Sequence, residues 1–365
     1  MRAWYAVHKW TSLVCTLFLL MLCVTGMPLI FRHEIDRALG YTLVAPEKAA
    51  TSARVSLDDI LAAARAKRHG DAVQFVLTEP GEPFVHYVRL GKTVQSPEPS
   101  GIDGYDVRTG AFLGEYVLER GVTSFLVKLH VEMFAGLGGT LFLGFMGLLL
   151  VASLVSGTVL YGPYMSKIAF GTVRRNRSSR LKWLDVHNLF GITTLMWFLV
   201  VGATGVVNTL AIPLFERWQS THLAEMTAWD RAHPPPTEPG LEDVATGSAQ
   251  RALEAALEAS PGTELSFLAF PGSDFAGPHH FVVFLQGTTP LTSKLLEPVW
   301  VDARTCRVVG ARKLPWYLTV LLLSQPLHFG NYGGMPLKVL WACLDAMTIV
   351  VLVSGIELWL QRRRV

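Results

Sequence analysis

The sequence predicts an α-helical membrane protein in which four transmembrane helices form a two-fold tandem repeat and carry two α+β modules outside the membrane. Three observations lead to this class. Half of the residues are hydrophobic and 17% are charged, which is more apolar than an ordinary soluble domain. Four apolar runs are long enough to cross about 30 Å of hydrocarbon. Two residue spacings also recur in both halves of the chain.

The four apolar runs cover residues 10–32, 137–162, 188–212 and 336–360. The first run lacks an Ala-x-Ala exit, so we interpret it as an uncleaved anchor rather than a signal peptide. The chain then divides into transmembrane helix 1 (1–36), outside module 1 (37–122), a membrane re-entry with transmembrane helix 2 (123–164), a basic loop (165–186), transmembrane helix 3 (187–213), outside module 2 (214–313), and a re-entry with transmembrane helix 4 and a basic tail (314–365).

Positive charge is sorted along the chain and predicts its orientation. The loop between the second and third runs contains the acid Asp185 and six basic residues: Lys167, Arg174, Arg175, Arg177, Arg180 and Lys182. By the positive-inside rule, this loop and both termini face the cytoplasm. We therefore expect a multi-pass protein of the bacterial inner membrane with both modules in the periplasm. Basic blocks with interleaved aromatic residues are missing, which argues against a nucleic-acid partner.

Each outside module is predicted to be a helix followed by strands. Ser56 is placed to cap the first helix, with Asp59 three residues later, and residues 247–259 form the second helix. Apolar alternation predicts strands at 73–77, 84–88, 265–270, 281–285 and from 299 onward.

Both modules close on the same turn, which reads Asp-Val-Arg-Thr-Gly at 106–110 and Asp-Ala-Arg-Thr-Cys at 302–306. Cys306 therefore takes the place of Gly110. Between Glu216 and Gly240 we expect a Pro-rich, semi-rigid connector.

Two histidine-to-glycine spacings are the most specific signal in the sequence. The distance is 18 residues in the first and third runs, and 27 residues where each module leads back into the membrane. The pairs are His8–Gly26 (26 − 8), His187–Gly205 (205 − 187), His130–Gly157 (157 − 130) and His328–Gly355 (355 − 328). Eighteen steps of about 100° return to the same helical face. Such an internal repeat implies a pseudo-two-fold axis along the membrane normal.

Under this axis the histidines pair at two depths. His8 and His187 face each other at the cytoplasmic edge, and His130 and His328 face each other at the outer edge. Ionisable residues at these depths are costly and are functional by default. Bis-imidazole ligation of b-type haem needs two such side chains from facing helices. The sequence therefore predicts two haem b groups, with His33 as the alternative axial ligand at the outer site.

Other interpretations of these residues remain open. Membrane-edge histidines also serve as interfacial anchors, and zinc ranks below haem because the outer pair has few further ligands in register beyond Glu132. The remaining histidines lie in polar stretches and are expected at the surface: His69, His86, His222, His233, His279 and His280. Cys15, Cys23 and Cys343 fall inside spans as packing residues. Cys306 has no partner in its module, so neither a disulfide nor a CxxC metal site is expected.

Over nearly its whole length the chain resembles the PepSY-associated membrane proteins of bacterial iron uptake. The resemblance rests on the Asp-x-Arg-Thr-Gly/Cys ends of the modules, the His-x-Trp opening of the first span, the Leu-His re-entries and the Ser-Gly-x-x-Leu-Tyr/Trp ends. It implies a di-haem b-type protein that reduces Fe(III) in a siderophore, so that the more weakly held Fe(II) is released in the periplasm. The implied haem ligands are His8, His187, His130 and His328, with His33 also matching.

The implied partners are a ferric siderophore of the hydroxamate type and, as electron donor, a membrane quinol or a cytoplasmic reductase. A nicotinamide cofactor is not expected, because residues 136–139 lack the spacing and the downstream acid of a dinucleotide fingerprint. A function of a different class is a non-catalytic membrane scaffold whose modules bind a periplasmic protein or regulate a peptidase. A siderophore transporter is a weaker alternative, since we expect four spans without intramembrane acids.

Overall fold

The computed structural model describes residues 1–47, 53–79, 81–117, 119–166, 168–232, 247–290 and 292–363. Lys167, His233 and the run Pro234–Pro236 of the predicted connector lie outside these residues. The chain forms two compact units. The helical unit comprises Met1–Arg32, Gly121–Pro213 and Val320–Val365, and the sheet unit comprises His33–Arg120 and Leu214–Thr319.

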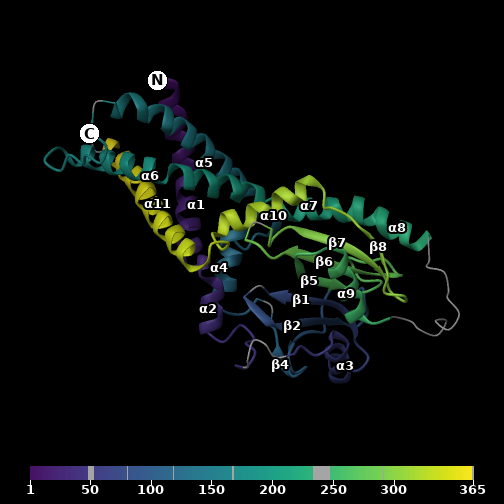
Figure 1. The fold of residues 1–365 in the computed structure, drawn as a ribbon. Helices are drawn as coiled ribbons and strands as arrows, with labels where there is room; N and C mark the ends of the chain where they lie inside the picture. The colour runs from purple at the N-terminus through teal and green to yellow at the C-terminus, as the bar shows by residue number, and fades with distance from the viewer. Residues whose placement is uncertain are drawn as a thin grey trace. The chain divides into compact units, whose positions relative to one another are not determined.

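The helical unit is built on four long apolar helices, which confirms the prediction of a multi-pass membrane protein. They are α1 (Arg2–Ile30), α5 (Gly136–Met165), α6 (Ser179–Asn208) and α11 (Gly334–Arg363), and each is long and apolar enough to cross a membrane. Helices α1 and α6 each pack against both α5 and α11, so α1 and α6 occupy opposite corners of the bundle. Both chain termini lie at one end of this bundle (Figure 1).

Two shorter helices, α4 (Gly121–Glu132) and α10 (Trp316–Phe329), precede α5 and α11. A sharp corner separates each of them from the long helix that follows. Met133 and Phe134 end α4 with φ values of 49° and 58°, and Gly330 ends α10 with φ 66°. The left-handed region is unfavourable for residues with a Cβ. The predicted re-entries are therefore separate helices, and each one places a histidine near its C-terminal end.

The sheet unit contains one antiparallel sheet of eight strands in the order β4-β3-β2-β1-β5-β6-β7-β8. The strands are β1 (Ala72–Glu79), β2 (Glu82–Gly91), β3 (Gly101–Asp106), β4 (Phe112–Glu115), β5 (Thr263–Ala269), β6 (His280–Gly287), β7 (Leu296–Asp302) and β8 (Val308–Ala311). The sequence predicts two modules, and the structure joins them into one sheet. The join is the β1–β5 pairing, in which Val76 is opposite Leu268.

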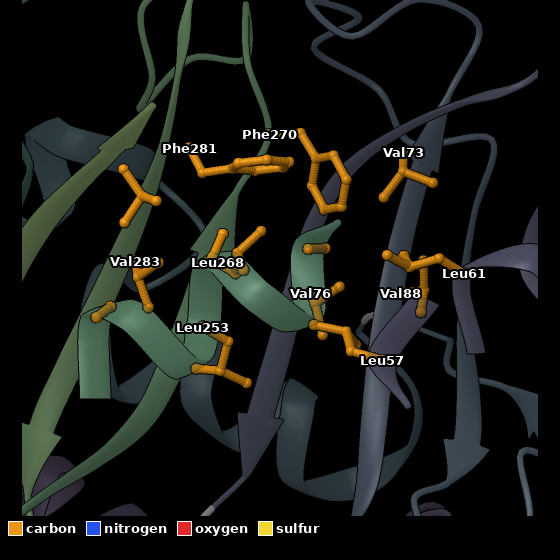
Figure 2. Packing of buried hydrophobic residues seen from close by; sticks show 14 of the residues in the cluster. Leu57, Leu61, Val73, Val76, Val88, Leu253, Leu268, Phe270, Phe281 and Val283 are labelled. Carbon is orange, nitrogen blue, oxygen red and sulfur yellow. The ribbon is translucent and has the colours of Figure 1, made fainter. Parts of the chain in front are cut away.

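Helices α3 (Leu57–Lys67) and α9 (Ala249–Ala259) cover one face of the sheet. The N-cap predicted at Ser56 is confirmed, since its hydroxyl accepts a hydrogen bond from the Asp58 amide, and Ser248 caps α9 in the same way. Figure 2 shows Leu57 and Leu61 of α3 and Leu253 of α9 directed at the strand residues Val76, Val88, Leu268 and Val283. Burial of each such leucine contributes roughly 1.5–3 kcal/mol. The core of the sheet unit therefore runs across both halves.

The two predicted turns have the same backbone geometry at their last residue. Gly110 has φ 70° and Cys306 has φ 59°, so Cys306 does occupy the position of Gly110. In each turn an aspartate accepts a backbone amide: Asp106 from Arg108 at 2.8 Å and Asp302 from Thr305 at 2.7 Å. Burial raises the pKa of the free Cys306 thiol, which makes it a poor nucleophile.

The predicted connector after Glu216 is wrong up to Ala232, because helices continue through this stretch. These are α7 (Ala211–Trp218), the π-helical turn η1 (Gln219–Leu223) and α8 (Ala224–Ala232). Trp218 stacks on Phe275 with ring centroids 6.3 Å apart. Asp230 of α8 accepts a hydrogen bond from His280 Nδ1 at 2.7 Å, and the His280 side chain is 3% exposed. The prediction that His280 lies at the surface is therefore also wrong. The same prediction is wrong for His86 of β2, whose Nδ1 atom is buried.

Candidate metal centres

The four predicted histidines form two pairs in the helical unit. His8 of α1 and His187 of α6 have ring centroids 6.3 Å apart with an interplanar angle of 70°, and we call this pair site 1. His130 of α4 and His328 of α10 have centroids 6.3 Å apart with an angle of 67°, and we call this pair site 2. Since α1 and α6 stand at opposite corners of the bundle, the site 1 rings meet across its centre.

Each ring lies against a glycine of another helix. A Cβ atom would lie 2.9 Å from His8 Cε1 at Gly157 and 3.6 Å from His187 Cε1 at Gly355. At Gly26 and Gly205 it would lie 3.1 Å from the Cε1 atoms of His130 and His328. The sequence paired each glycine with the histidine of its own 18- or 27-residue spacing, and the structure pairs it with another one. Each glycine accommodates a histidine of a neighbouring helix rather than its own spacing partner.

The Nδ1 atom of every ring is engaged by a protein oxygen. Three Nδ1 atoms lie within 3.0 Å of backbone carbonyls, namely His8 on Ser153, His187 on Val351 and His328 on Val201. Because a carbonyl only accepts, these Nδ1 atoms carry the proton, and the neutral ring keeps a lone pair on Nε2. His130 Nδ1 lies 2.9 Å from the Thr25 hydroxyl. This is the orientation in which a histidine ligates a metal through Nε2.

The separation of the rings fits one metal ion per pair. An imidazole nitrogen binds a metal at about 2.0–2.1 Å, and the ring centroid lies about 1.1 Å behind that nitrogen given the ring bond lengths. Two rings that bind one ion from opposite sides therefore have centroids about 6.3 Å apart, and both pairs have that value. All four histidines are half-buried residues of the bundle.

The donor set of each site consists of two imidazoles. No group of three or more His, Cys, Asp or Glu residues that could hold a metal ion occurs among the described residues. A structural zinc site uses four protein ligands, so two histidines do not complete one. Haem supplies the other donors of its iron from its own macrocycle and needs axial ligands from the protein. The residues present fit two bis-histidine haems.

His33 belongs to α2 (Arg32–Ala38) and has contacts within the sheet unit. Its Nε2 lies 3.9 Å from a carboxylate oxygen of Glu82, which also lies 3.6 Å from Arg37. Its ring packs on Gly81 closely enough to leave no room for a Cβ there. His33 thus has a carboxylate neighbour of its own and is a member of neither histidine pair.

Serine and threonine hydroxyl groups lie beside the Nδ1 atoms of the histidines. The sequence analysis did not predict them, although each stands directly before one of the repeated glycines. Besides Thr25 on His130, the Ser354 hydroxyl lies 3.1 Å from His187 Nδ1 and the Thr204 hydroxyl lies 3.4 Å from His328 Nδ1. The Ser156 hydroxyl lies 3.5 Å from His8 Nδ1. All four hydroxyl residues directly precede the glycine on which the ring packs. The Thr-Gly and Ser-Gly dipeptides therefore have the same role at all four histidines: the hydroxyl contacts Nδ1 and the glycine makes room for the ring.

The bundle between the two sites contains aromatic residues and one acid. Trp197 of α6 contacts Trp341 of α11, with ring centroids 6.4 Å apart. Asp345 of α11 is 5% exposed and lies near Cys23 of α1. The expectation of four spans without intramembrane acids is therefore wrong. Asp345 lies within the fourth apolar run, residues 336–360.

Comparison with known proteins agrees with this architecture. One relative is an uncharacterized protein, PA4219 of Pseudomonas aeruginosa, which is 24% identical over 255 residues. That alignment covers 65% of this chain and 63% of the relative, so the chain spans less than two thirds of that protein's length. A family model described as the PepSY-associated TM region matches residues 5–362. With a match over nearly its whole length, the chain belongs to the PepSY-associated TM region family.

Proposed function

We propose that this protein is a di-haem b-type reductase of the bacterial inner membrane that reduces Fe(III)-siderophores and releases Fe(II) in the periplasm. One observation carries the proposal. Two histidine pairs lie in one membrane bundle, and each pair has the ring separation expected for two imidazoles that bind one ion from opposite sides. The finer resemblance of the sequence is to the ferrioxamine reductase FoxB, which supports a hydroxamate siderophore as the substrate.

The orientation and the tandem repeat belong to the same proposal. By the positive-inside rule, the basic loop near Arg174 and the basic residues near both termini support a cytoplasmic position for site 1. Site 2 then lies on the periplasmic side, as does the sheet unit. Matched pairs of residues at both sites, including the four Ser-Gly and Thr-Gly elements, support two repeats related by a pseudo-two-fold axis.

When bound, haem supplies an iron that gains and loses one electron at a time, with a potential set by its axial ligands and surroundings. The chain's own residues hold that group. The carbonyls of Ser153, Val351 and Val201 fix the Nδ1–H tautomer, so that Nε2 points its lone pair away from the helix. The glycines allow each ring to approach a neighbouring backbone. The apolar bundle excludes water, which raises the strength of every charge interaction at the sites.

The overall reaction needs an electron donor on the cytoplasmic side and a ferric chelate on the other. A membrane quinol or a cytoplasmic reductase is the proposed donor. Each electron converts one Fe(III) to Fe(II) in the chelate, and the siderophore holds Fe(II) more weakly. The iron that is reduced and released is therefore the iron of the siderophore, which is the substrate, and not the iron of the haem.

Re-oxidation kinetics test this function directly. Detergent-purified protein is reduced with dithionite, freed of excess reductant and mixed with a ferric hydroxamate siderophore while the reduced haem band is followed. We expect rapid re-oxidation, with Fe(II) trapped by a ferrous-specific chelator in equal amount. The gallium-loaded siderophore is the matched control, because Ga(III) has similar size and charge but does not accept an electron under these conditions.

A non-catalytic scaffold is the second candidate function. It is favoured by the sheet unit, whose terminal strands β4 and β8 each pair on one side among the described strands. Free strand edges can accept an added strand from a partner protein. A scaffold would show no re-oxidation by the ferric siderophore beyond that seen with the gallium complex.

A further inference from the structure

Asp345 is a buried acid to which the proposed function gives no role. Its side chain is 5% exposed, and the Cys23 thiol of α1 is its neighbour from another helix. The Oδ2 atom is buried and has no hydrogen-bond partner among the described residues. Carboxyl groups inside a membrane are costly and mark functional sites by default.

Two further unpartnered polar atoms belong to residues around Asp345. Trp341 lies one turn before Asp345 on the same face of α11, and it contacts Trp197 of α6. The Nε1 atoms of both tryptophans are buried without a hydrogen-bond partner. A buried polar group without a partner is costly. Three such atoms, on Asp345 and the two tryptophans, lie in an otherwise apolar bundle, and we call these three residues the polar cluster.

This polar cluster lies next to site 2 on two helices. On α1, Cys23 is two residues before Thr25, whose hydroxyl contacts His130 Nδ1. On α11, the Trp341 ring lies against Gly330, which is two residues after His328. Asp345 therefore has neighbours on α1 and α11 that lie within two residues of a residue that contacts, or is, a histidine of site 2.

Few other titratable groups surround Asp345. From α1 it faces Cys23, and α6 has no charged residue between Asn188 and Asn208. On α11 itself the nearest charged residue is Lys338, two turns earlier. The titratable groups of α4 and α10 at this end are His130 and His328 of site 2 and, on either side of His130, Lys128 and Glu132. A change of charge at site 2 therefore acts on Asp345 within an apolar part of the bundle.

We propose that Asp345 is a redox-linked protonation site of site 2, an inference that rests on the proposed function. An electron that arrives at site 2 adds a negative charge to a region of low dielectric constant, and this favours the protonated carboxyl. The carboxylate then takes one proton from the solvent at Oδ2. When the electron leaves for the ferric chelate, the proton returns to the solvent. One proton thus accompanies one electron, and the net charge of the buried region stays constant.

Spectroelectrochemical titration of the detergent-purified holo-protein tests this proposal. We expect the midpoint potential of one of two haems to fall with rising pH by up to about 59 mV for each tenfold change in proton activity. Asp345→Asn removes the titrating group and should abolish this slope. Glu357→Gln is the matched control, because it makes the same chemical change three turns further along α11, and it should keep the slope.

An infrared measurement on the wild-type protein tests the same proposal and does not need Asp345→Asn to fold. The reduced-minus-oxidised infrared spectrum of the wild-type protein should contain a carboxylic-acid C=O band that shifts in D2O. Wild-type midpoints that do not change with pH, an unchanged slope in Asp345→Asn, or a spectrum without that band would overturn the protonation site while leaving a di-haem protein. Purified protein without haem would overturn the proposed function as well, so the two failures are distinguishable.

Discussion

Individual glycines decide how closely the histidine rings approach the helices, and the four contacts are not equally tight. A Cβ at Gly157 would lie 2.9 Å from His8 Cε1, which is closer than side-chain carbons pack. A Cβ at Gly355 would lie 3.6 Å from His187 Cε1, which is ordinary van der Waals contact. The two members of site 1 therefore respond differently to the same substitution.

Gly157→Ala should weaken site 1, whereas Gly355→Ala should be tolerated. The new methyl group in Gly157→Ala pushes the His8 ring away from the Ser153 carbonyl that orients it. Loss of such an orienting contact typically lowers metal affinity about 10–100-fold. Haem content per chain after purification measures the effect. Gly162→Ala is a control in the same helix, since Gly162 is exposed and a Cβ there meets no atom within 4 Å. Equal loss of haem in Gly157→Ala and Gly355→Ala would contradict the packing argument.

His86 of β2 provides a prediction about pH and stability in the sheet unit. Burial, with a smaller effect of Arg54, lowers the pKa of His86 to about 4 from its ordinary 6.5. Between these values the unfolded chain binds the proton and the folded chain does not, so stability falls as pH falls from about 6.5 to 4. The loss reaches about 3 kcal/mol. Urea unfolding followed by circular dichroism should show it. His86→Gln should flatten this dependence, and an unchanged profile would contradict the assignment.

Sequence patterns found the four paired histidines because their spacings repeat, but they missed the residues that act through packing. The hydroxyls of Thr25 and Ser354 are ordinary residues of a span until a ring from another helix is placed beside them. Asp345 was not predicted as an intramembrane acid, because a single acid hardly changes the mean hydropathy of a span. His33 matches the resemblance, yet its contacts are with Glu82 and Gly81.

At the scale of elements, the turn that ends β3 requires a left-handed residue. Gly110 has φ 70°, and a Cβ there would meet Val55 at 3.7 Å, which is ordinary contact. The expected effect of Gly110→Ala is therefore conformational, with a loss of about 1–2 kcal/mol in unfolding free energy. Gly310→Ala in β8 is the control, because its φ is not positive and a Cβ there meets nothing within 4 Å. Equal stability of Gly110→Ala and the wild type would contradict the role of the turn.

Element boundaries followed from periodicity where the pattern was strong. The four spans, the helix capped by Ser56 and the central strands were all predicted. The short edge strands β4 and β8 were missed, because four residues are too few for an alternating pattern to be distinctive. The sequence predicted a connector from Glu216 onward because of the prolines at 234–236. The structure has helices there up to Ala232.

For the whole molecule, the sequence predicted two modules where the structure has one eight-stranded sheet. The β1–β5 pairing joins residues nearly two hundred positions apart, and strand pairing between modules leaves no local signal. The core around Val76 and Leu268 spans both halves. A consequence is that the two halves of the sheet unit should unfold together in one transition rather than as two separate modules.

The central claim is that each histidine pair holds one haem, and haem stoichiometry tests it most directly. Absorption spectra of the purified protein, oxidised and dithionite-reduced, give the spin state and the number of haems per chain. We predict two low-spin b-type haems in the wild-type protein. His187→Ala should retain the spectrum of site 2 alone, and His328→Ala that of site 1 alone. Protein without a Soret band, or full haem content in both variants, would contradict the account.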